Sequence, residues 1–428
     1  MPSSQKEREC IVSLIFSPPT SLLRAIATLL ISICWPQVVS ANPSYTFSVE
    51  NLVHEAWRIN PELQAIALLG QAAQQDLDRA WKERLPAPGM SIQAGAKDQQ
   101  VVFSLRQPIW SGGRISANID LSKEKKNFTY IQKQQQYSVV SQEILDNIEI
   151  ALKSNEQIKI YHNGLSQLRV LLDMMRRRTS SGVSPENDTS VIQARMSTMQ
   201  TTIVNLQSSK EGALDRLTLL TGLPVEANYL SIPAPEELPL RPADRDSDAI
   251  ATALAFSPGI NIKKSQYRQA VQAAKISKTS FFPTVYVETQ YSINSGASHG
   301  DGRVFIGLDY SFSNGLGEFE STLSSQSKAK SAAHEVSVSE RNLRSEMKTS
   351  LTYYRSLKDF LNSAESGVYS SSDVLDSYRR LFLIGEKSWL EVLNAVREKV
   401  QLETLLSDAR ISVSITHYKI ENMMGNLS

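Results

Sequence analysis

One pattern of turn residues occurs twice along the chain, and this duplication constrains the fold more than any local motif. Pro61 and Pro258 lie 197 residues apart (258 − 61), as do Pro86 and Pro283. Further along, an offset of 203 residues (315 − 112) links three pairs of glycines: Gly112 with Gly315, Gly182 with Gly385, and Gly222 with Gly425. Self-similarity at a fixed spacing marks a repeated structural unit, here of roughly 170 residues.

Within each copy the hydrophobic pattern changes its period. Residues 60–84 have apolar positions three and four apart and predict a helix, with Pro61 in its first turn. The segments 90–96 and 101–109 follow, and their alternating side chains predict a β-hairpin. In the second copy, 285–292 and 304–312 alternate more regularly, with one apolar face and one polar face.

Two structures are compatible with this alternation. The hairpins could lie on the core of a soluble protein, or they could form a barrel wall with lipid outside and a polar lumen inside. The segments that follow favour the barrel, because each predicts a long helix, a glycine turn and a return helix that ends at Gly222 or Gly425. A helix of about 65 residues is close to 100 Å long at ~1.5 Å per residue, which suits a structure that crosses a large gap.

The N-terminus has the pattern of an export signal. An apolar core at 25–35 follows positively charged residues, and Val39-Ser40-Ala41 offers the small residues of a cleavage site, so we expect the mature chain to begin at Asn42. Both cysteines, Cys10 and Cys34, lie in the removed segment, so the mature chain is expected to have no disulfide. A lipoprotein anchor at Cys34 is the weaker alternative, because a bulky isoleucine precedes it.

These boundaries divide the chain into four parts. They are a signal peptide (1–41), a first repeat (42–222), a connector (223–245) and a second repeat (246–428). The connector contains five prolines and cannot form a long helix, so we expect it on the outside of the helical body.

Nothing in the chain predicts an enzyme, a cofactor or a metal site. The five histidines are scattered without the spacing of metal ligands. Gly112-Gly113-Arg114 lacks the further glycine and the Lys-Ser/Thr pair of a phosphate loop, so it predicts a turn between a strand and a helix. The net charge of +1 gives no electrostatic reason to expect nucleic acid as a partner.

The order of these features resembles the TolC family of trimeric outer-membrane exit ducts over essentially all of the mature chain. The segments that carry the resemblance are 60–63 (NPEL), 107–114 (QPIWSGGR), 310–315 (YSFSNG) and 385–395 (GEKSWLEVLNA). The last segment also resembles the LapE type, the branch that serves type I secretion of large adhesins.

The resemblance implies a mainly α-helical protein with a membrane β-barrel in the outer membrane. Four strands per chain cannot close a barrel, and open strand edges cannot face lipid, so three chains would supply twelve strands. The long helices would continue as a periplasmic tunnel. Trp110, Phe281 and Phe282 would lie in the aromatic girdle at the membrane surface, with packing against the ends of the helices as the alternative.

The resemblance also implies that the two helical turns form a periplasmic tip. Gly182, Val183, Gly385 and Glu386 are the turn residues expected to contact a periplasmic adaptor. The family closes its tip partly with polar links between the hairpins, and the matching residues are Asp188 and Lys387. Two aspartates of its entrance ring correspond to Glu391 and Asn394, so one carboxylate is kept and the other is lost. The alternative for all four residues is an ordinary solvated tip.

The implied function is passive export. The homotrimer would conduct substrate from an inner-membrane ABC transporter and its adaptor, a membrane fusion protein, through the outer-membrane lipid to the exterior. Type I secretion of a large protein is the first expectation, and small-molecule efflux is the second. A periplasmic coiled-coil adaptor is a more distant alternative, because adaptors typically carry one helical hairpin and this chain predicts two.

Overall fold

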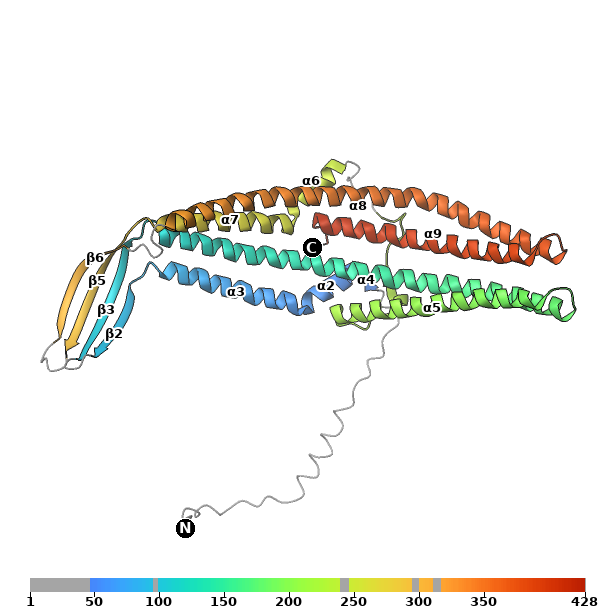
Figure 1. The fold of residues 1–428 in the computed structure, drawn as a ribbon, viewed down its shortest axis with the longest axis horizontal. Helices are drawn as coiled ribbons and strands as arrows, with labels where there is room; N and C mark the ends of the chain where they lie inside the picture. The colour runs from blue at the N-terminus through green and yellow to red at the C-terminus, as the bar shows by residue number, and fades with distance from the viewer. Residues whose placement is uncertain (1–46, 95–98, 239–245, 295–299, 311–316, 428) are drawn as a thin grey trace, which may run out of the picture. The chain divides into compact units, whose positions relative to one another are not determined.

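The two halves of the chain fold into matching sets of helices. The computed structural model describes residues 47–94, 99–238, 246–294, 300–310 and 317–427 (Figure 1), so the predicted signal peptide and both cysteines lie outside the described residues. The first half contains α2 (Val49–Ile59), α3 (Pro61–Lys82), α4 (Arg114–Ser180) and α5 (Glu186–Thr221). The second contains α6 (Asp246–Phe256), α7 (Pro258–Thr279), α8 (Gly317–Leu383) and α9 (Trp389–Met424).

Corresponding helices have the same length in both halves. The helices α3 and α7 have 22 residues each, α4 and α8 have 67, and α5 and α9 have 36. The predicted pair of long helical hairpins is therefore confirmed, and 67 residues at ~1.5 Å each correspond to about 100 Å. The boundaries drawn for the two repeats stay predictions.

The described strands form one sheet from both halves. Its order is β2 (Ala87–Ala94), β3 (Gln99–Trp110), β5 (Thr284–Asn294) and β6 (Asp301–Asp309), and every neighbouring pair is antiparallel. The long pairing of β3 with β5 joins the two halves. Among the described residues, β2 and β6 are the two edges of this sheet.

The helices follow the order of the strands. Beside the sheet the neighbours are α3, α4, α7 and α8, and toward the turns they are α5, α4, α9 and α8. Residues 46–428 form one unit, and Figure 1 shows the sheet at one end of its long helices and both hairpin turns at the other. Each edge strand of the sheet is therefore a chain neighbour of an outer helix: β2 follows α3, and β6 precedes α8.

Short helices continue the line of the return helices. Gly222 and Gly425 end α5 and α9 with φ angles of 68° and 80°, the left-handed conformation that glycine adopts at least cost. A Cβ atom at Gly222 would meet the side chain of Ile59, and one at Gly425 would overlap Phe256. The ends of α5 and α9 thus lie against the ends of α2 and α6, just before α3 and α7 begin.

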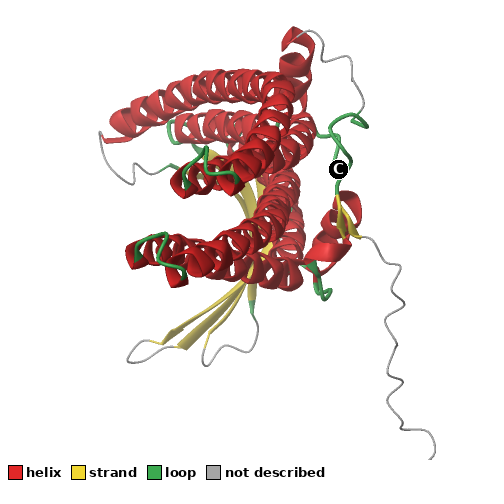
Figure 2. Cartoon of the chain, turned by 90° about the vertical axis from the view of Figure 1, so that its right-hand side faces the viewer, coloured by secondary structure: helices red, strands yellow, loops and turns green. Residues whose placement is uncertain are grey.

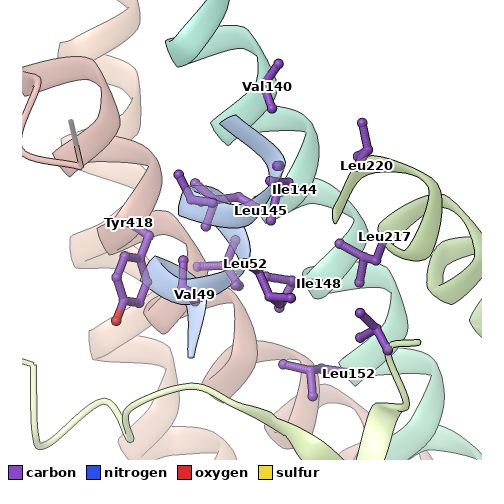
Figure 3. Close-up of a cluster of buried hydrophobic side chains, with 14 of the residues drawn as sticks. Val49, Leu52, Val140, Ile144, Leu145, Ile148, Leu152, Leu217, Leu220 and Tyr418 are labelled. Carbon is purple, nitrogen blue, oxygen red and sulfur yellow. The ribbon is translucent and has the colours of Figure 1, made fainter. Parts of the chain in front are cut away.

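The largest apolar cluster lies where these ends meet (Figure 3). Residues of α2, α4, α5 and α9 bury Leu52, Ile144, Ile148, Leu217 and Ile415 almost completely. The connector reaches this core through Val225, and the two-residue strand β4 (Leu230–Ser231) pairs in parallel with β1 (Phe47–Ser48). As predicted, the described part of the connector contains no long helix; it contains the short 3-10 helix η1 (Ala227–Tyr229).

None of the described helices combines the length and the hydrophobicity that crossing a membrane requires.

Candidate functional site: the two-faced sheet and the hairpin turns

The sheet has one face of apolar side chains that remain exposed in the single chain. The register brings Met90, Phe103 and Tyr291 into one row across three strands. On β6, Val304 is 71% exposed and Ile306 is 76% exposed. The other exposed apolar residues on this face are Ile92, Leu105, Ile293 and Leu308. A contiguous apolar surface of this kind marks contact with lipid or with another protein.

The opposite face carries charged groups that bond to one another. Arg106 Nε donates a hydrogen bond to Glu288 Oε2 at 3.0 Å, and its guanidinium lies 3.5 Å from the centre of the Tyr286 ring. Asp309 on β6 lies 3.8 Å from the same arginine, and the Gln290 amide donates to the second oxygen of Glu288 at 2.7 Å. These contacts link β3, β5 and β6 and define a polar side of the sheet.

Aromatic side chains cluster where the strands lead into the helices. The ring centres of Trp110 and Phe282 are 6.0 Å apart in an edge-to-face arrangement, and those of Phe281 and Phe319 are 5.1 Å apart. Trp110 and Phe282 are each about half exposed. Each ring therefore has an aromatic packing partner, and a place in an aromatic girdle at the membrane surface stays a prediction. Phe319, at the start of α8, was not among the residues singled out in the sequence.

The two hairpin turns have the same backbone structure (Figure 2, green, at the end facing the viewer). Gly182 and Gly385 have φ angles of 73° and 84°, and the residue after each glycine donates to the carbonyl five residues earlier. These bonds, from Val183 to Arg178 and from Glu386 to Leu381, are both 2.9 Å long. The pattern is the glycine-based cap that satisfies the last carbonyls of a helix.

The turns lie close enough to line one hollow together. Its walls include Arg177, Val183 and Gly385, and the Arg178 guanidinium lies 5.0 Å from the centre of the Phe382 ring. Val183, Leu383 and Ile384 are more than 60% exposed around it, at 63%, 70% and 70%. Of the four predicted turn residues, Val183 and Gly385 line this hollow, whose surface is both apolar and basic. Contact of the turn residues with an adaptor stays a prediction.

At the second turn the structure brings Lys387 and Glu391 together. Lys387 Nζ lies 2.6 Å from Glu391 Oε1 and 4.6 Å from the centre of the Tyr378 ring. Glu391 also accepts from the backbone of Ser388, whose hydroxyl accepts from Glu391 N, so the pair belongs to a helix cap. The hydrogen bond between them raises the pKa of Lys387 and lowers the pKa of Glu391.

Asp188 does not pair with Lys387 in the single chain. It lies in the first turn of α5, and no ion pair to it is formed among the described residues. Lys387 bonds to Glu391 instead, because a spacing of four residues places both groups on one side of the helix start. A link between Asp188 and Lys387, within a chain or between chains, stays a prediction. Asn394 is not part of this cluster and lines a separate hollow between α5 and α9.

A polar cluster joins the two hairpins halfway along α4 and α9. Lys419 bridges Asp146 and Glu149 at 2.7 and 2.9 Å, and the Gln157 amide donates to both oxygens of Asp408 at 2.8 and 2.9 Å. Burial raises the pKa of Asp408, although the hydrogen bond from Gln157 and the charge of Lys153 act in the opposite direction. Burial would also raise the pKa of Glu149, but hydrogen bonds from Lys153 and Lys419 lower it overall.

The described residues contain no group of three or more His, Cys, Asp or Glu side chains placed to hold a metal ion.

A protein-family model matches residues in the first half of the fold. The family model described as "Outer membrane efflux protein" matches residues 52–223. A curated relative, the outer membrane efflux protein BepC of Brucella suis biovar 1 (strain 1330), is 23% identical over 216 residues. Those residues are 47% of this chain and 47% of BepC, so the match spans about half the length of each protein.

Solved structures share the fold over most of the chain. The outer membrane protein VceC of Vibrio cholerae has a TM-score of 0.75 at 14% identity, over 88% of this chain and 96% of VceC. The outer-membrane channel OprN has a TM-score of 0.78 at 16% identity, over 88% and 90% of the two chains. The outer membrane channel CmeC of Campylobacter jejuni has a TM-score of 0.73 at 13% identity, over 88% and 85%.

The comparisons confirm the expected fold and match the chain to outer-membrane proteins. The TolC-type fold, mainly helical with a small sheet, is that of the similar structures. The proteins that the chain resembles are outer-membrane channels rather than enzymes. The segment that resembles the LapE type, 385–395, lies outside the residues that the family model matches.

Proposed function

We propose that this protein is the outer-membrane exit duct of a tripartite export system and that it works as a homotrimer. The observation that carries the proposal is the sheet with an exposed apolar face, a charged face and two open edges. Lipid would cover the apolar face, and the face with Arg106 and Glu288 would line the lumen.

The open edges explain why one chain is not enough. Edge strands have unpaired N–H and C=O groups, which cannot face lipid without a large desolvation cost. In the alternating sheet, β2 and β6 run in opposite directions, so β6 of one chain can pair with β2 of the next in the same antiparallel way. This contact uses different surfaces on the two chains and generates a ring. Three chains give twelve strands, a barrel wide enough to leave a lumen.

The helices extend this ring away from the membrane. In each chain α8 is the edge helix on the β6 side, and α3 and α5 are the edge helices on the β2 side. Apolar side chains remain exposed on these edges, among them Leu68, Leu69, Val204, Leu323, Phe360 and Tyr369. Contact between α8 of one chain and α3 and α5 of the next would cover them and close a periplasmic tunnel.

An adaptor and an inner-membrane ABC transporter are the proposed partners, with the adaptor at the hairpin turns. The exposed Val183, Leu383 and Ile384 beside Arg177 and Arg178 support a docking surface there. Type I secretion of a large adhesin is the narrower proposal, and it rests on the segment 385–395. Small-molecule efflux is the second candidate, and the description of BepC as an efflux protein favours it.

Deleting the gene and identifying the adaptor that purifies with the tagged protein would separate these functions. A type I duct should co-purify with the adaptor of a protein-exporting ABC transporter, and its loss should remove a large protein from the cell surface or the medium. An efflux duct should leave surface proteins unchanged, and its loss should make cells sensitive to small toxic compounds. A tagged protein found only in the soluble periplasmic fraction would contradict both.

A further inference from the structure

A second hollow lies apart from the turns, between α5 and α9 and above α4. It encloses about 150 Å³. The two walls contribute polar groups in matching positions: Arg195, Thr198 and Thr202 from α5, and Asn394, Arg397 and Gln401 from α9. The floor is apolar, with Leu168 of α4 buried beneath it.

The charges in this hollow all have one sign. Arg195 and Arg397 both line it, and no carboxylate does. Neither guanidinium has an ion pair within the part of the chain that the structure describes, whereas Arg176, Arg379 and Arg410 each lie within 4 Å of an acidic residue. Two arginines without counter-ions, beside hydroxyl and amide groups and over an apolar floor, fit a ligand with an anionic head and an apolar body.

The neutral side chain of Asn394 leaves the positive charge of Arg195 and Arg397 in this hollow uncompensated. The resemblance assigns an acidic residue to that position, and a carboxylate there would lie in the same hollow as both arginines. The amide of Asn394 leaves their charge uncompensated and can still hydrogen-bond to an oxygen of a ligand.

We propose that the hollow between Arg195 and Arg397 binds the carboxylate of a small organic anion. The guanidinium groups hold the carboxylate, and the floor formed by Leu168, Met199 and Leu393 covers its apolar body. If the protein conducts solutes as proposed above, the site gives the duct a preference for carboxylate-bearing cargo.

Calorimetric titration of the detergent-solubilised full chain with sodium benzoate tests the site. Benzamide is the neutral probe of the same shape, and sodium sulfate is the inorganic anion. Benzoate should bind and benzamide should not, while sulfate should bind more weakly because it leaves the apolar floor uncovered. Loss of one charge-assisted contact should weaken benzoate binding about tenfold in Arg195→Gln and in Arg397→Gln. Asn394→Asp should abolish benzoate binding, because the new carboxylate would compete with benzoate for the guanidinium groups of Arg195 and Arg397.

Arg169→Gln is the matched control. Arg169 is an exposed arginine of α4 that does not line the hollow, so its replacement should leave benzoate affinity unchanged. Equal binding of benzamide and benzoate, or equal losses in Arg169→Gln and Arg397→Gln, would overturn the proposal. Sulfate binding as tight as benzoate binding would overturn the assignment to an organic anion.

Separate measurements of benzoate binding and of channel conductance distinguish failure of this site from failure of the proposed function. If the wild-type protein forms no channel in a planar bilayer but still binds benzoate through Arg195 and Arg397, the proposed function fails and the site stands. If it conducts but binds no benzoate, the site fails and the duct stands.

Discussion

At the scale of single residues, the second hairpin turn contains a polar cluster in which Lys387 bonds to Glu391 and Ser388 caps α9. The sequence alone predicts the cap, because Ser388 and Glu391 form the Ser-x-x-Glu signature of a helix start. The sequence does not predict the hydrogen bond from Gln157 to Asp408, because 251 residues separate the two side chains and only the packing of α4 on α9 brings them together.

If the hairpin turns close the proposed duct, Lys387→Glu should increase the leak through them. In the wild-type protein Lys387 bonds to Glu391 and lies over the Tyr378 ring. The substitution replaces this cation by a carboxylate, which repels Glu391. Single-channel conductance in a planar bilayer should rise, whereas Lys387→Arg keeps the charge and should conduct like the wild type. Equal conductance of all three proteins would mean that the cluster has no part in closure.

Asp408→Asn should stabilise the protein at neutral pH. Burial raises the pKa of Asp408, so the ionised form disfavours folding once the pH exceeds the ordinary pKa of the unfolded carboxyl. The asparagine removes this cost and still accepts a hydrogen bond from Gln157. The unfolding temperature should therefore rise at pH 7.5, and the gain should disappear below about pH 4.

Asp146→Asn should have the opposite effect at pH 7.5, because it removes a partner of Lys419. The adjacent Glu149 has a lowered pKa, so its contribution to stability is present above the ordinary carboxyl pKa and is lost as the pH falls through the folded value. Thermal unfolding of the purified protein as a function of pH measures the effects of both substitutions. A lower unfolding temperature for Asp408→Asn at neutral pH would show that its charge is satisfied in the fold.

At the scale of elements, periodicity predicted the long helices and the strands to within a few residues. It works there because long helices average over many turns and because glycine and proline mark their ends. The helix α2 was missed although Val49, Leu52, Val53 and Ala56 have helical spacing after the capping residue Ser48. The pairing of β1 with β4 leaves no signal, since it joins two strands of two residues each.

Replacing a glycine at the end of a return helix should destabilise the fold. Gly425→Ala needs a positive φ at an alanine and also overlaps Phe256, at a cost of at least ~1–2 kcal/mol. Gly212→Ala is the control inside α5, where a Cβ atom meets nothing within 4 Å, and it should stabilise by about 0.5–1 kcal/mol. Urea unfolding of the two variants should give changes of opposite sign. Similar changes would contradict the end-to-end packing of α9 on α6.

A charge should be tolerated on one face of the sheet only. Ile306→Arg lies on the apolar face and should cost roughly 2–4 kcal/mol if that face meets the centre of a bilayer. Ser292→Arg lies on the polar face of β5 and should be nearly neutral. The amount of folded protein in the outer-membrane fraction measures the difference. Equal assembly of both variants would contradict a lipid-facing sheet.

At the scale of the whole molecule, the duplication predicted most of the architecture. Two copies of one unit give two hairpins of helices and two of strands, and the strand order β2-β3-β5-β6 places both copies in one wall. The chain sequence cannot show how that wall curves or how many copies close it, because both depend on contacts between chains. Those contacts between chains would involve the edge elements of each chain, which are β2, β6, α3, α5 and α8.

The mass of the detergent-extracted complex tests the central claim most directly. Native mass spectrometry of protein taken from the outer-membrane fraction should give three chains per particle, with the sheet still present by circular dichroism. The two edges must pair with further chains, and three chains of four strands supply the twelve strands of the proposed barrel. A monomer that keeps its sheet in detergent would contradict the account, because its edges and its apolar face would then be stable without partners.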